Sequence, residues 1–248
     1  QAMADDVGMT YEEYWNQIIK ACYLDYENPV IERNKTISSI WEISQKLSNM
    51  KIQYIHMVWD DVDLKLKIWS DRKWMHWEWR NIPSFEIFTS PDFRDVEGWM
   101  KFNQPLYRYG QKINWISLKF EKGEIVEFDA TEWKDVLAGI LEIPGTRFLG
   151  EFSLTDSRHS HITKFMWETL YDENMWWEFG NTHIAIWMSF DETYVGNLNN
   201  LSEEEKKQLG FNQSTEHADI ISTADRTVTA YLENGSEVVI YKKGKFMI

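Results

Sequence analysis

His217 and Asp219 are two potential metal ligands that stand two positions apart, in the stretch STEHADIIST. In a β-strand, side chains two positions apart point to the same side of the sheet, so an imidazole and a carboxylate would face one point. Such a pair fits a divalent cation, and it also fits a surface strand with two outward polar residues. By itself the pair does not decide between these alternatives.

Three further polar residues lie in apolar, strand-like stretches. Glu86 stands between aromatic residues in NIPSFEIFTSPD, Glu151 follows a glycine in RFLGEFSLTD, and His183 begins HIAIWMSF. A carboxylate in such surroundings is costly to bury unless it meets a cation or hydrogen-bond donors. A single histidine in a strand more often has a structural, hydrogen-bonded role than a ligand role. Together with His217 and Asp219, however, these residues form the ligand set of a hydrolytic two-metal site.

The elements that must position these residues follow from the apolar periodicity. Spacing and end signals predict helices over 11–25, 29–50, 131–142 and 160–170, the second beginning with a proline. Period-two patterns and turn signals predict strands over 51–59, 62–69, 73–80, 113–120, 125–129, 183–190, 217–223, 227–232 and 237–241. In VDLKLKIW the alternation places Trp69 on the polar face.

The order of these elements predicts the α+β class. We expect a single domain with a mixed, largely antiparallel sheet and packed helices over residues 11–248, preceded by a polar tail over 1–10. No repeat or low-complexity segment interrupts the chain. A P-loop, a dinucleotide-binding fingerprint and a GxSxG nucleophile motif are also absent from the sequence.

The amino-acid composition limits the kinds of ligand and partner that the protein is expected to bind. The net charge of −14 disfavours nucleic acid and anionic membranes and favours a cationic ligand or a divalent metal. The single cysteine excludes an internal disulfide and a thiolate cluster, and no apolar run reaches the ~20 residues of a membrane span. We therefore expect a cytoplasmic protein. The 14 tryptophans exceed what one core usually needs and indicate an aromatic pocket or an interface.

Taken in order, these segments resemble the aminopeptidase T / aminopeptidase S / PepS family of metallo-aminopeptidases, from about Tyr11 to the C-terminus. NIPSFEIFTSPDFRDVEG resembles the segment with the first glutamate ligand, and RFLGEFSL the segment with the second. TLYDEN and GNTHIAI resemble the region of the first histidine ligand, and FNQSTEHADII that of the last histidine and aspartate. The resemblance implies the metal ligands Glu86, Glu151, His183, His217 and Asp219, with Glu173 as a further site position.

The resemblance also implies a pair of divalent metal ions, zinc or cobalt, that activate a bridging water and anchor the free N-terminus of a peptide. Glu151 would bridge the metals or act as the general base. Self-association is expected because the family is dimeric.

Two departures concern activity. Residues 11–248 are expected to correspond to the family's catalytic domain alone, without the N-terminal domain that helps to enclose the site. Phe190 stands where the family's strand usually ends in an active-site tyrosine, and a phenyl ring cannot donate a hydrogen bond to an oxyanion. Loss of one such donor typically costs ~10²–10³ in rate.

A third departure is tryptophan at positions where relatives tend to have glycine or another small residue. An indole adds about 150–250 Å² of surface that can be buried. The tryptophans in question are Trp77, Trp79, Trp115, Trp167, Trp176, Trp177 and Trp187, to which the outward Trp69 is added.

Three hypotheses follow. The first is a metallo-aminopeptidase, truncated or redesigned, with reduced activity. The second is a non-catalytic scaffold without a cofactor, shaped by evolution or engineering, whose tryptophans form an oligomer interface or an aromatic ligand pocket. In the third, the indoles only fill the core and the ligands are left over from ancestry.

Overall fold

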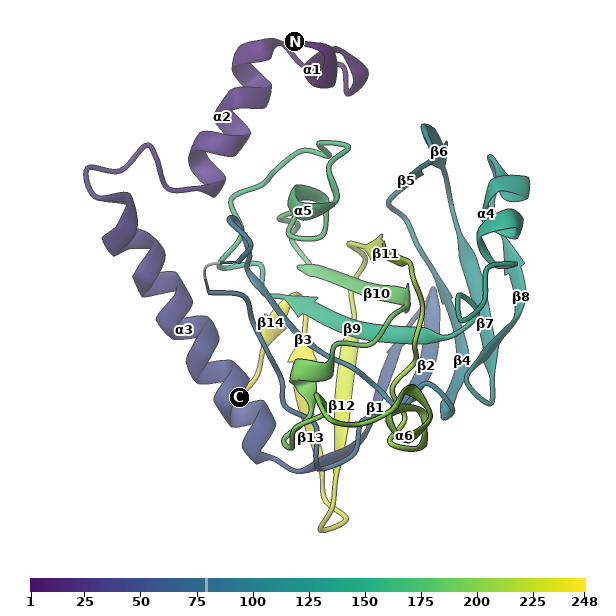
Figure 1. The fold of residues 1–248 in the computed structure, drawn as a ribbon. Coiled ribbons are helices and arrows are strands. Elements are labelled where there is room, and N and C mark those ends of the chain that lie inside the picture. The colour runs from purple at the N-terminus through teal and green to yellow at the C-terminus, as the bar shows by residue number, and fades with distance from the viewer. Residues whose placement is uncertain (79) are drawn as a thin grey trace.

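The computed structural model describes residues 1–78 and 80–248, without the side chain of Trp187. Trp79 and the Trp187 side chain, both named above, therefore lie outside the described residues. Two antiparallel sheets and a β-hairpin form the framework (Figure 1). The expected α+β class is observed, but the strands divide between two sheets instead of forming one.

The larger sheet has eight strands in the order β14–β13–β12–β1–β2–β4–β7–β8. Its strands are β1 (Ile52–Trp59), β2 (Val62–Lys67), β4 (Val96–Lys101), β7 (Ser117–Glu121), β8 (Glu124–Asp129), β12 (Thr227–Leu232), β13 (Glu237–Lys242) and β14 (Lys245–Phe246). The hairpin consists of β5 (Leu106–Arg108) and β6 (Gln111–Ile113). All the pairs between these strands are antiparallel.

The smaller sheet has the order β11–β10–β9–β3, and its strands are β3 (Glu86–Thr89), β9 (Leu149–Thr155), β10 (Asn181–Trp187) and β11 (His217–Ser222). The apolar residues of one face, Phe152, Leu154, Ile184 and Ile220, belong to the same hydrophobic core as Ile55 and Leu64 of the larger sheet. Because side chains alternate along each strand, the residues between them point to the opposite face. That opposite face carries the candidate ligands.

Helices are few and lie at the periphery. They are α1 (Ala2–Asp6), α2 (Tyr11–Ala21), α3 (Pro29–Asn49), α4 (Lys134–Ile140), α5 (Thr169–Asp172), α6 (Glu203–Gln208) and the 3₁₀ turn η1 (Asp191–Thr193). Thr10 and Asn28 cap α2 and α3 by accepting backbone N–H bonds, which fixes their starts. Figure 1 shows α3 along one flank of the sheets. No described helix has the length and apolar character needed to cross a membrane.

Most predicted elements are found within a few residues of their expected bounds, but several segments differ from the expectation. The described residues of the predicted strand 73–80, which exclude Trp79, form no strand, and among them Met75 bridges to Phe88. The chain turns away at Trp69, which has a φ of 66°, and β4 pairs with β2 instead. Trp115 lies in a bend between β6 and β7, with a φ of 50°, and not in a strand. The expected tail over 1–10 contains α1, and Ala4 is buried.

The predicted helix over 160–170 is absent apart from the first residues of α5. Trp167 has a φ of 56°, which a right-handed helix cannot accommodate. The Asp172 carboxylate accepts hydrogen bonds from the backbone N–H of Met166 (2.6 Å) and of Glu168 (3.0 Å). Side-chain bonds thus replace the helical ladder and hold this segment as a loop over the small sheet.

Gly180 sets the start of β10. It has a φ of 70°, and a Cβ there would lie 1.9 Å from the hydroxyl of Tyr241 and 2.6 Å from the carbonyl oxygen of Thr155. The Tyr241 hydroxyl donates to that same carbonyl at 2.9 Å. Glycine is therefore required where the large sheet, β9 and β10 meet, because any side chain would separate them.

Candidate metal centre

Each strand of the small sheet contributes to one polar group of side chains. Ala185 of β10 is paired with Glu151 on one side and with Asp219 on the other, so the three side chains form a row across the sheet. The Ala185 methyl group leaves open the space between the two carboxylates. His183 lies two residues before Ala185, on the same face. The strand register therefore brings together residues that are up to 133 positions apart in the sequence.

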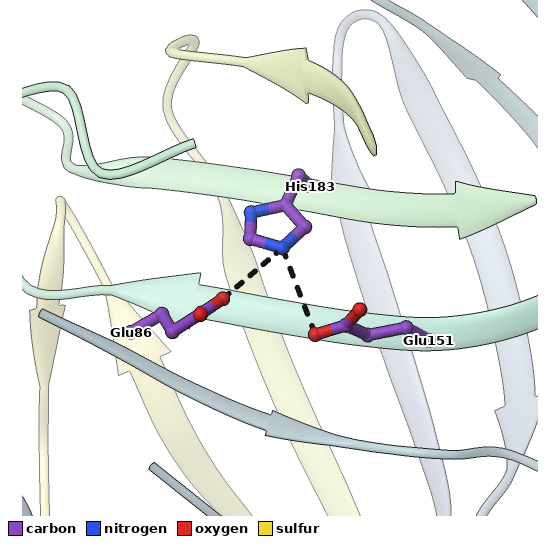
Figure 2. A group of neighbouring side chains, drawn as sticks. All are labelled: Glu86, Glu151 and His183. Carbon is purple, nitrogen blue, oxygen red and sulfur yellow. Dashed lines mark ion pairs between the residues drawn. The ribbon is translucent and has the colours of Figure 1, made fainter. Parts of the chain in front are cut away.

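His183 lies at the centre of the group (Figure 2). Its Nε2 is 3.2 Å from Glu86 Oε2, 3.8 Å from Glu151 Oε1 and 3.9 Å from Asp219 Oδ1. Its side chain is only 1% exposed, and those of the three acids are 3–5% exposed. A water-excluded site with three carboxylates around one imidazole results.

His217 forms a second centre beside the first. Its Nε2 is 3.2 Å from Glu151 Oε2 and 3.1 Å from Asp219 Oδ1. Glu151 thus directs one oxygen to each imidazole. The sequence-predicted pair of His217 and Asp219 does face one point, as the alternation along β11 requires.

Glu173, at the end of α5, completes the group from above the sheet. It is buried, and its carboxylate lies within ligand distance of His183 and Asp219. The amide nitrogen of Asn174 donates to Glu173 Oε1 at 3.3 Å, and Asn174 Oδ1 accepts from the backbone N–H of Phe85 at 2.6 Å. Asn174 therefore ties Glu173 to the strand that carries Glu86.

Ser153 and Ala185, like Asn174, were not identified from the sequence. The Ser153 hydroxyl donates to Glu86 Oε2 at 3.0 Å and fixes that carboxylate. A signal was present for Ser153, because it lies two residues after Glu151 on the same face of β9. For Ala185 the signal was its position two residues after His183. No sequence signal marks Asn174, because its role depends on a contact with Phe85, which is distant in the sequence.

Excess negative charge governs the protonation of the group. Burial raises the pKa of Glu86, against the opposing effect of His183, and raises the pKa of Glu173 well above its usual range. Burial alone would lower the pKa of both histidines, but the carboxylates around them raise it well above the ordinary value. Burial likewise opposes ionisation of Asp219, yet His217 lowers its pKa to about 2. Without metal, the folded site therefore retains protons at neutral pH that the same groups would lose if they were exposed to solvent.

The donor set fits divalent metal ions. Three overlapping groups each place one ligand atom per residue within 4.8 Å of the others: Glu86, Glu151 and His183; Glu151, His217 and Asp219; and Glu173, His183 and Asp219. When all six groups are ionised, four carboxylates exceed two imidazolium groups by two negative charges, and no described Lys or Arg forms an ion pair with them. Mixed imidazole and carboxylate ligands suit zinc and related divalent metals.

Phe190 lies directly beside the group. Its ring centroid is 5.2 Å from that of His217 in an edge-on contact, 5.2 Å from Phe88 and 5.8 Å from Trp77. Trp77 thus belongs, with Phe88 and Phe190, to a group of aromatic rings next to His217.

The other tryptophans with described side chains are spread over the molecule. Trp167 is half-buried and stacks on Tyr107, with ring centroids 4.9 Å apart. Trp69, Trp115, Trp176 and Trp177 are 39%, 63%, 38% and 43% exposed. These indoles retain solvent-accessible surface, whereas Trp74 is only 2% exposed and belongs to the hydrophobic core.

Comparison with known proteins agrees with this fold and donor set. A profile of the thermophilic metalloprotease family (M29) matches residues 1–246. The chain is 30% identical to aminopeptidase PepS of Streptococcus thermophilus over 249 residues, which cover 94% of this chain and 58% of PepS. It is 27% identical to aminopeptidase AmpS of Bacillus subtilis, over 94% of this chain and 58% of AmpS.

Among solved structures, AmpT from Thermus thermophilus superposes with a TM-score of 0.81 at 23% identity, covering 94% of this chain and 58% of AmpT. The fold and the buried carboxylate–imidazole group thus define a metalloprotease-type domain. The chain belongs to the thermophilic metalloprotease (M29) family. It spans a little over half the length of the relatives that it matches.

Proposed function

We propose that this chain is the catalytic domain of a metal-dependent aminopeptidase, which releases the first residue of peptides with a free N-terminus. The observation that carries the proposal is the convergence of six buried or half-buried ligand side chains on one face of the small sheet. Membership of a metalloprotease family and similarity to aminopeptidases support the reaction class.

Two divalent ions, zinc or cobalt, would be held by Glu86, Glu151, His183, His217 and Asp219, with Glu173 beside them. When bound, such ions polarise a carbonyl group and lower the pKa of water. The distribution of distances supports a division into two centres, one around His183 and one around His217.

Glu151 is assigned the role of the shared residue. Its Oε1 faces His183 and its Oε2 faces His217, so it is placed to span both centres. A carboxylate between two cationic centres is also placed to accept a proton during hydrolysis. Ser153 holds Glu86 in place by its hydrogen bond, and the loops over the small sheet exclude water from His183.

Turnover of aminoacyl anilides tests this function. The protein, first freed of metal and then supplied with zinc or cobalt, is expected to release anilide, and a Glu151→Ala variant is expected to lack this activity. A protein that binds neither metal and turns over no anilide would contradict the proposal.

A second role, self-association, is favoured by a specific observation. Trp176 and Trp177 are adjacent, and both are more than a third exposed. Large exposed indoles are enriched at interfaces. We infer that they contribute to contact with a second copy. Sedimentation of the protein and of a double variant, Trp176→Ser with Trp177→Ser, tests this: a lower mass only in the variant supports it, and equal masses refute it.

A further inference from the structure

Two cavities of unequal size adjoin the metal centre at different points along β11. The larger, about 1090 Å³, is bordered by Phe190, which touches His217 at the start of the strand. The smaller, about 220 Å³, is lined by Asp219 and Ile221, further along the strand. Because β11 advances about 3.3 Å per residue, the larger cavity lies near the His217 end of the ligand pair and the smaller near the Asp219 end.

The walls of the small cavity combine apolar and acidic groups. Leu106 and Phe165 line it together with Tyr107, Trp167 and Ile221, and so do the acidic residues Glu168, Asp172 and Asp219. The rings of Tyr107 and Trp167 are stacked, with an interplanar angle of 18°. These two rings come from segments far apart in the sequence, the β5–β6 hairpin and the loop before α5. They form one aromatic wall of the cavity.

An aminopeptidase needs this asymmetry. On one side of the scissile bond its substrate has a single residue, for which a small pocket suffices. On the other side the peptide continues and needs a wide space. The difference between about 220 and 1090 Å³ matches that requirement.

We propose that the small cavity receives the side chain of the peptide's first residue and that Trp167 sets its size. The assignment rests on the proposed aminopeptidase function. The stacked rings of Tyr107 and Trp167 favour an aliphatic or aromatic side chain of moderate size. The carboxylates that also line the cavity disfavour acidic side chains, because like charges repel at short distance.

Trp167 offers a clean substitution. Its φ of 56° is a conformation that glycine adopts without strain, so Trp167→Gly removes the indole while the backbone stays in place. Trp115→Gly is the matched control, because Trp115 has a φ of 50°, is 63% exposed and lines neither cavity. Both changes remove the same side chain from the same kind of backbone position.

The test measures kcat/KM for leucyl and 2-naphthylalanyl anilides with the metal-loaded wild type and both variants. Pocket contacts of one or two groups are worth about 10–200-fold in discrimination. Trp167→Gly is expected to shift the ratio about tenfold or more toward the naphthyl substrate, and Trp115→Gly to leave it within about twofold. An unchanged ratio in Trp167→Gly, or an equal shift in both variants, would overturn the assignment.

Binding separates this inference from the proposed function. The hydroxamates of leucine and 2-naphthylalanine are titrated calorimetrically into the same three metal-loaded proteins. If the wild type cleaves no anilide but Trp167→Gly alone shifts the ratio of the two Kd values, the aminopeptidase activity fails and the pocket assignment stands. If neither hydroxamate binds, or if the ratio does not move, the pocket assignment fails whatever the anilides show.

Discussion

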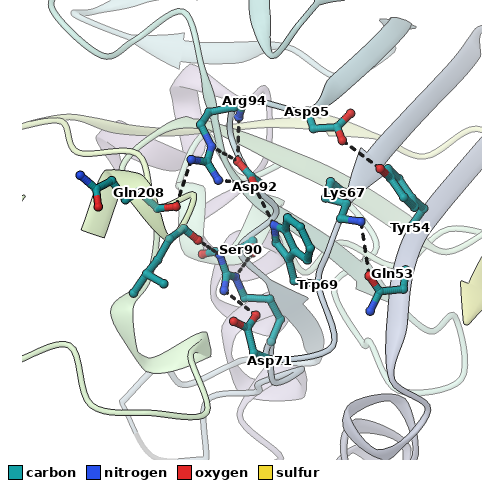
Figure 3. Close-up of polar contacts among 12 residues, drawn as sticks. Gln53, Tyr54, Lys67, Trp69, Asp71, Ser90, Asp92, Arg94, Asp95 and Gln208 are labelled. Atoms are coloured by element: carbon teal, nitrogen blue, oxygen red, sulfur yellow. Dashed lines mark hydrogen bonds and ion pairs between the residues drawn. The ribbon is translucent and has the colours of Figure 1, made fainter. Parts of the chain in front are cut away.

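Asp92 and the carboxylates of the small sheet are both buried, but their charges are balanced differently. Asp92, only 2% exposed, accepts hydrogen bonds from Arg94 Nε (2.8 Å), Arg94 Nη2 (2.7 Å) and Trp69 Nε1 (2.8 Å), as Figure 3 shows. Lys67 lies 4.0 Å from the centroid of the Trp69 ring. Burial opposes ionisation of Asp92, yet the bonds from Arg94 and Trp69 lower its pKa. This cluster is complete with the protein's own groups.

The small-sheet group has the reverse balance. Four carboxylates meet two histidines, whose charge depends on bound protons, whereas Asp92 meets an arginine that is always charged. Nδ1 of His183 and Nδ1 of His217 are buried, and within the described part of the chain no hydrogen-bond partner reaches either atom. A buried acidic cluster that needs an external cation is thereby distinguished from one that is purely structural.

The contrast also explains Trp69. The sequence pattern places it on the polar face of the strand predicted over 62–69, as a candidate for an interface or a pocket. In the structure its indole N–H donates a hydrogen bond to Asp92, and its ring contacts Lys67. Trp69 therefore has a structural role, although part of its ring remains exposed.

The largest effect is expected from replacing Glu151, the carboxylate that faces both histidines. Glu151→Gln keeps the volume but removes the charge, and we expect anilide turnover to fall by about 10³ or more, the upper range for one acid–base group. Metal content, measured by mass spectrometry, should fall as well. Because the change relieves repulsion among buried acids, the metal-free protein should not be destabilised. Full turnover in Glu151→Gln would show that the charge of Glu151 is not needed for catalysis and that the small-sheet group does not differ from the Asp92 cluster in this respect.

The aromatic neighbours of the two clusters give a second test. Trp69 donates a hydrogen bond to its acid, whereas Phe190, beside His217, has no donor to offer. Phe190→Tyr adds a phenol at the site, and we expect kcat to rise by about 10²-fold, the worth of one oxyanion donor. Steady-state kinetics on leucyl anilide measure it, with Phe88→Tyr as a control for a phenol elsewhere in the same group of rings. A rate that does not rise would show that position 190 does not reach the reacting carbonyl.

The third test addresses the complete cluster. Asp92→Asn removes the charge that Arg94 and Trp69 share, and we expect a loss of about 2 kcal/mol in the free energy of unfolding, because charged hydrogen bonds are worth about that much. Metal content and turnover should stay at wild-type levels. Urea unfolding measures the loss, and Asp95→Asn, which loses only the 3.0 Å bond from Tyr54, is the milder control. A fall in metal content in Asp92→Asn would mean that the two clusters are coupled.

Sequence patterns indicate which polar side chains the small sheet brings together, but they indicate the surrounding elements less well. Polar residues in apolar strands are unusual, and the order of these residues resembles that of a known family: Glu86, Glu151, His183, His217 and Asp219. Alternation along each strand then gives their common face. Their distances, however, depend on strand register, which arises from contacts between distant segments and not from local pattern.

Local pattern failed where side chains override backbone preference. The segment 160–170 has helical spacing, but Asp172 takes the N–H groups of Met166 and Glu168. The small cavity could not be predicted either, because Tyr107 and Trp167 meet only through the tertiary fold. The sequence marks Trp167 as a tryptophan where relatives tend to have a small residue. No local pattern connects it with Tyr107, so the cavity that the two rings border cannot be predicted from it.

Stability against pH gives the last distinction between the two clusters. The pKa values of Glu86 and Glu173 are raised by burial, so above about pH 4.5 the folded, metal-free chain keeps protons that the unfolded chain loses. Stability must then fall as pH rises. The raised pKa values of His183 and His217 act in the same direction above about pH 6.5. Asp92, with its lowered pKa, acts oppositely, because its contribution is lost only as pH falls below about 3.8.

With a chelator present, the melting temperature should therefore decline from about pH 5 to about pH 8, and bound zinc should flatten the decline because the metal replaces the protons. Thermal unfolding followed by circular dichroism measures both curves. Glu173→Gln should flatten the chelated curve in part, since it removes one of the two raised carboxyl groups, whereas Asp92→Asn should lower the curve without changing its slope in this range. Parallel curves with and without zinc would show that the small-sheet group balances its own charge, as the Asp92 cluster does.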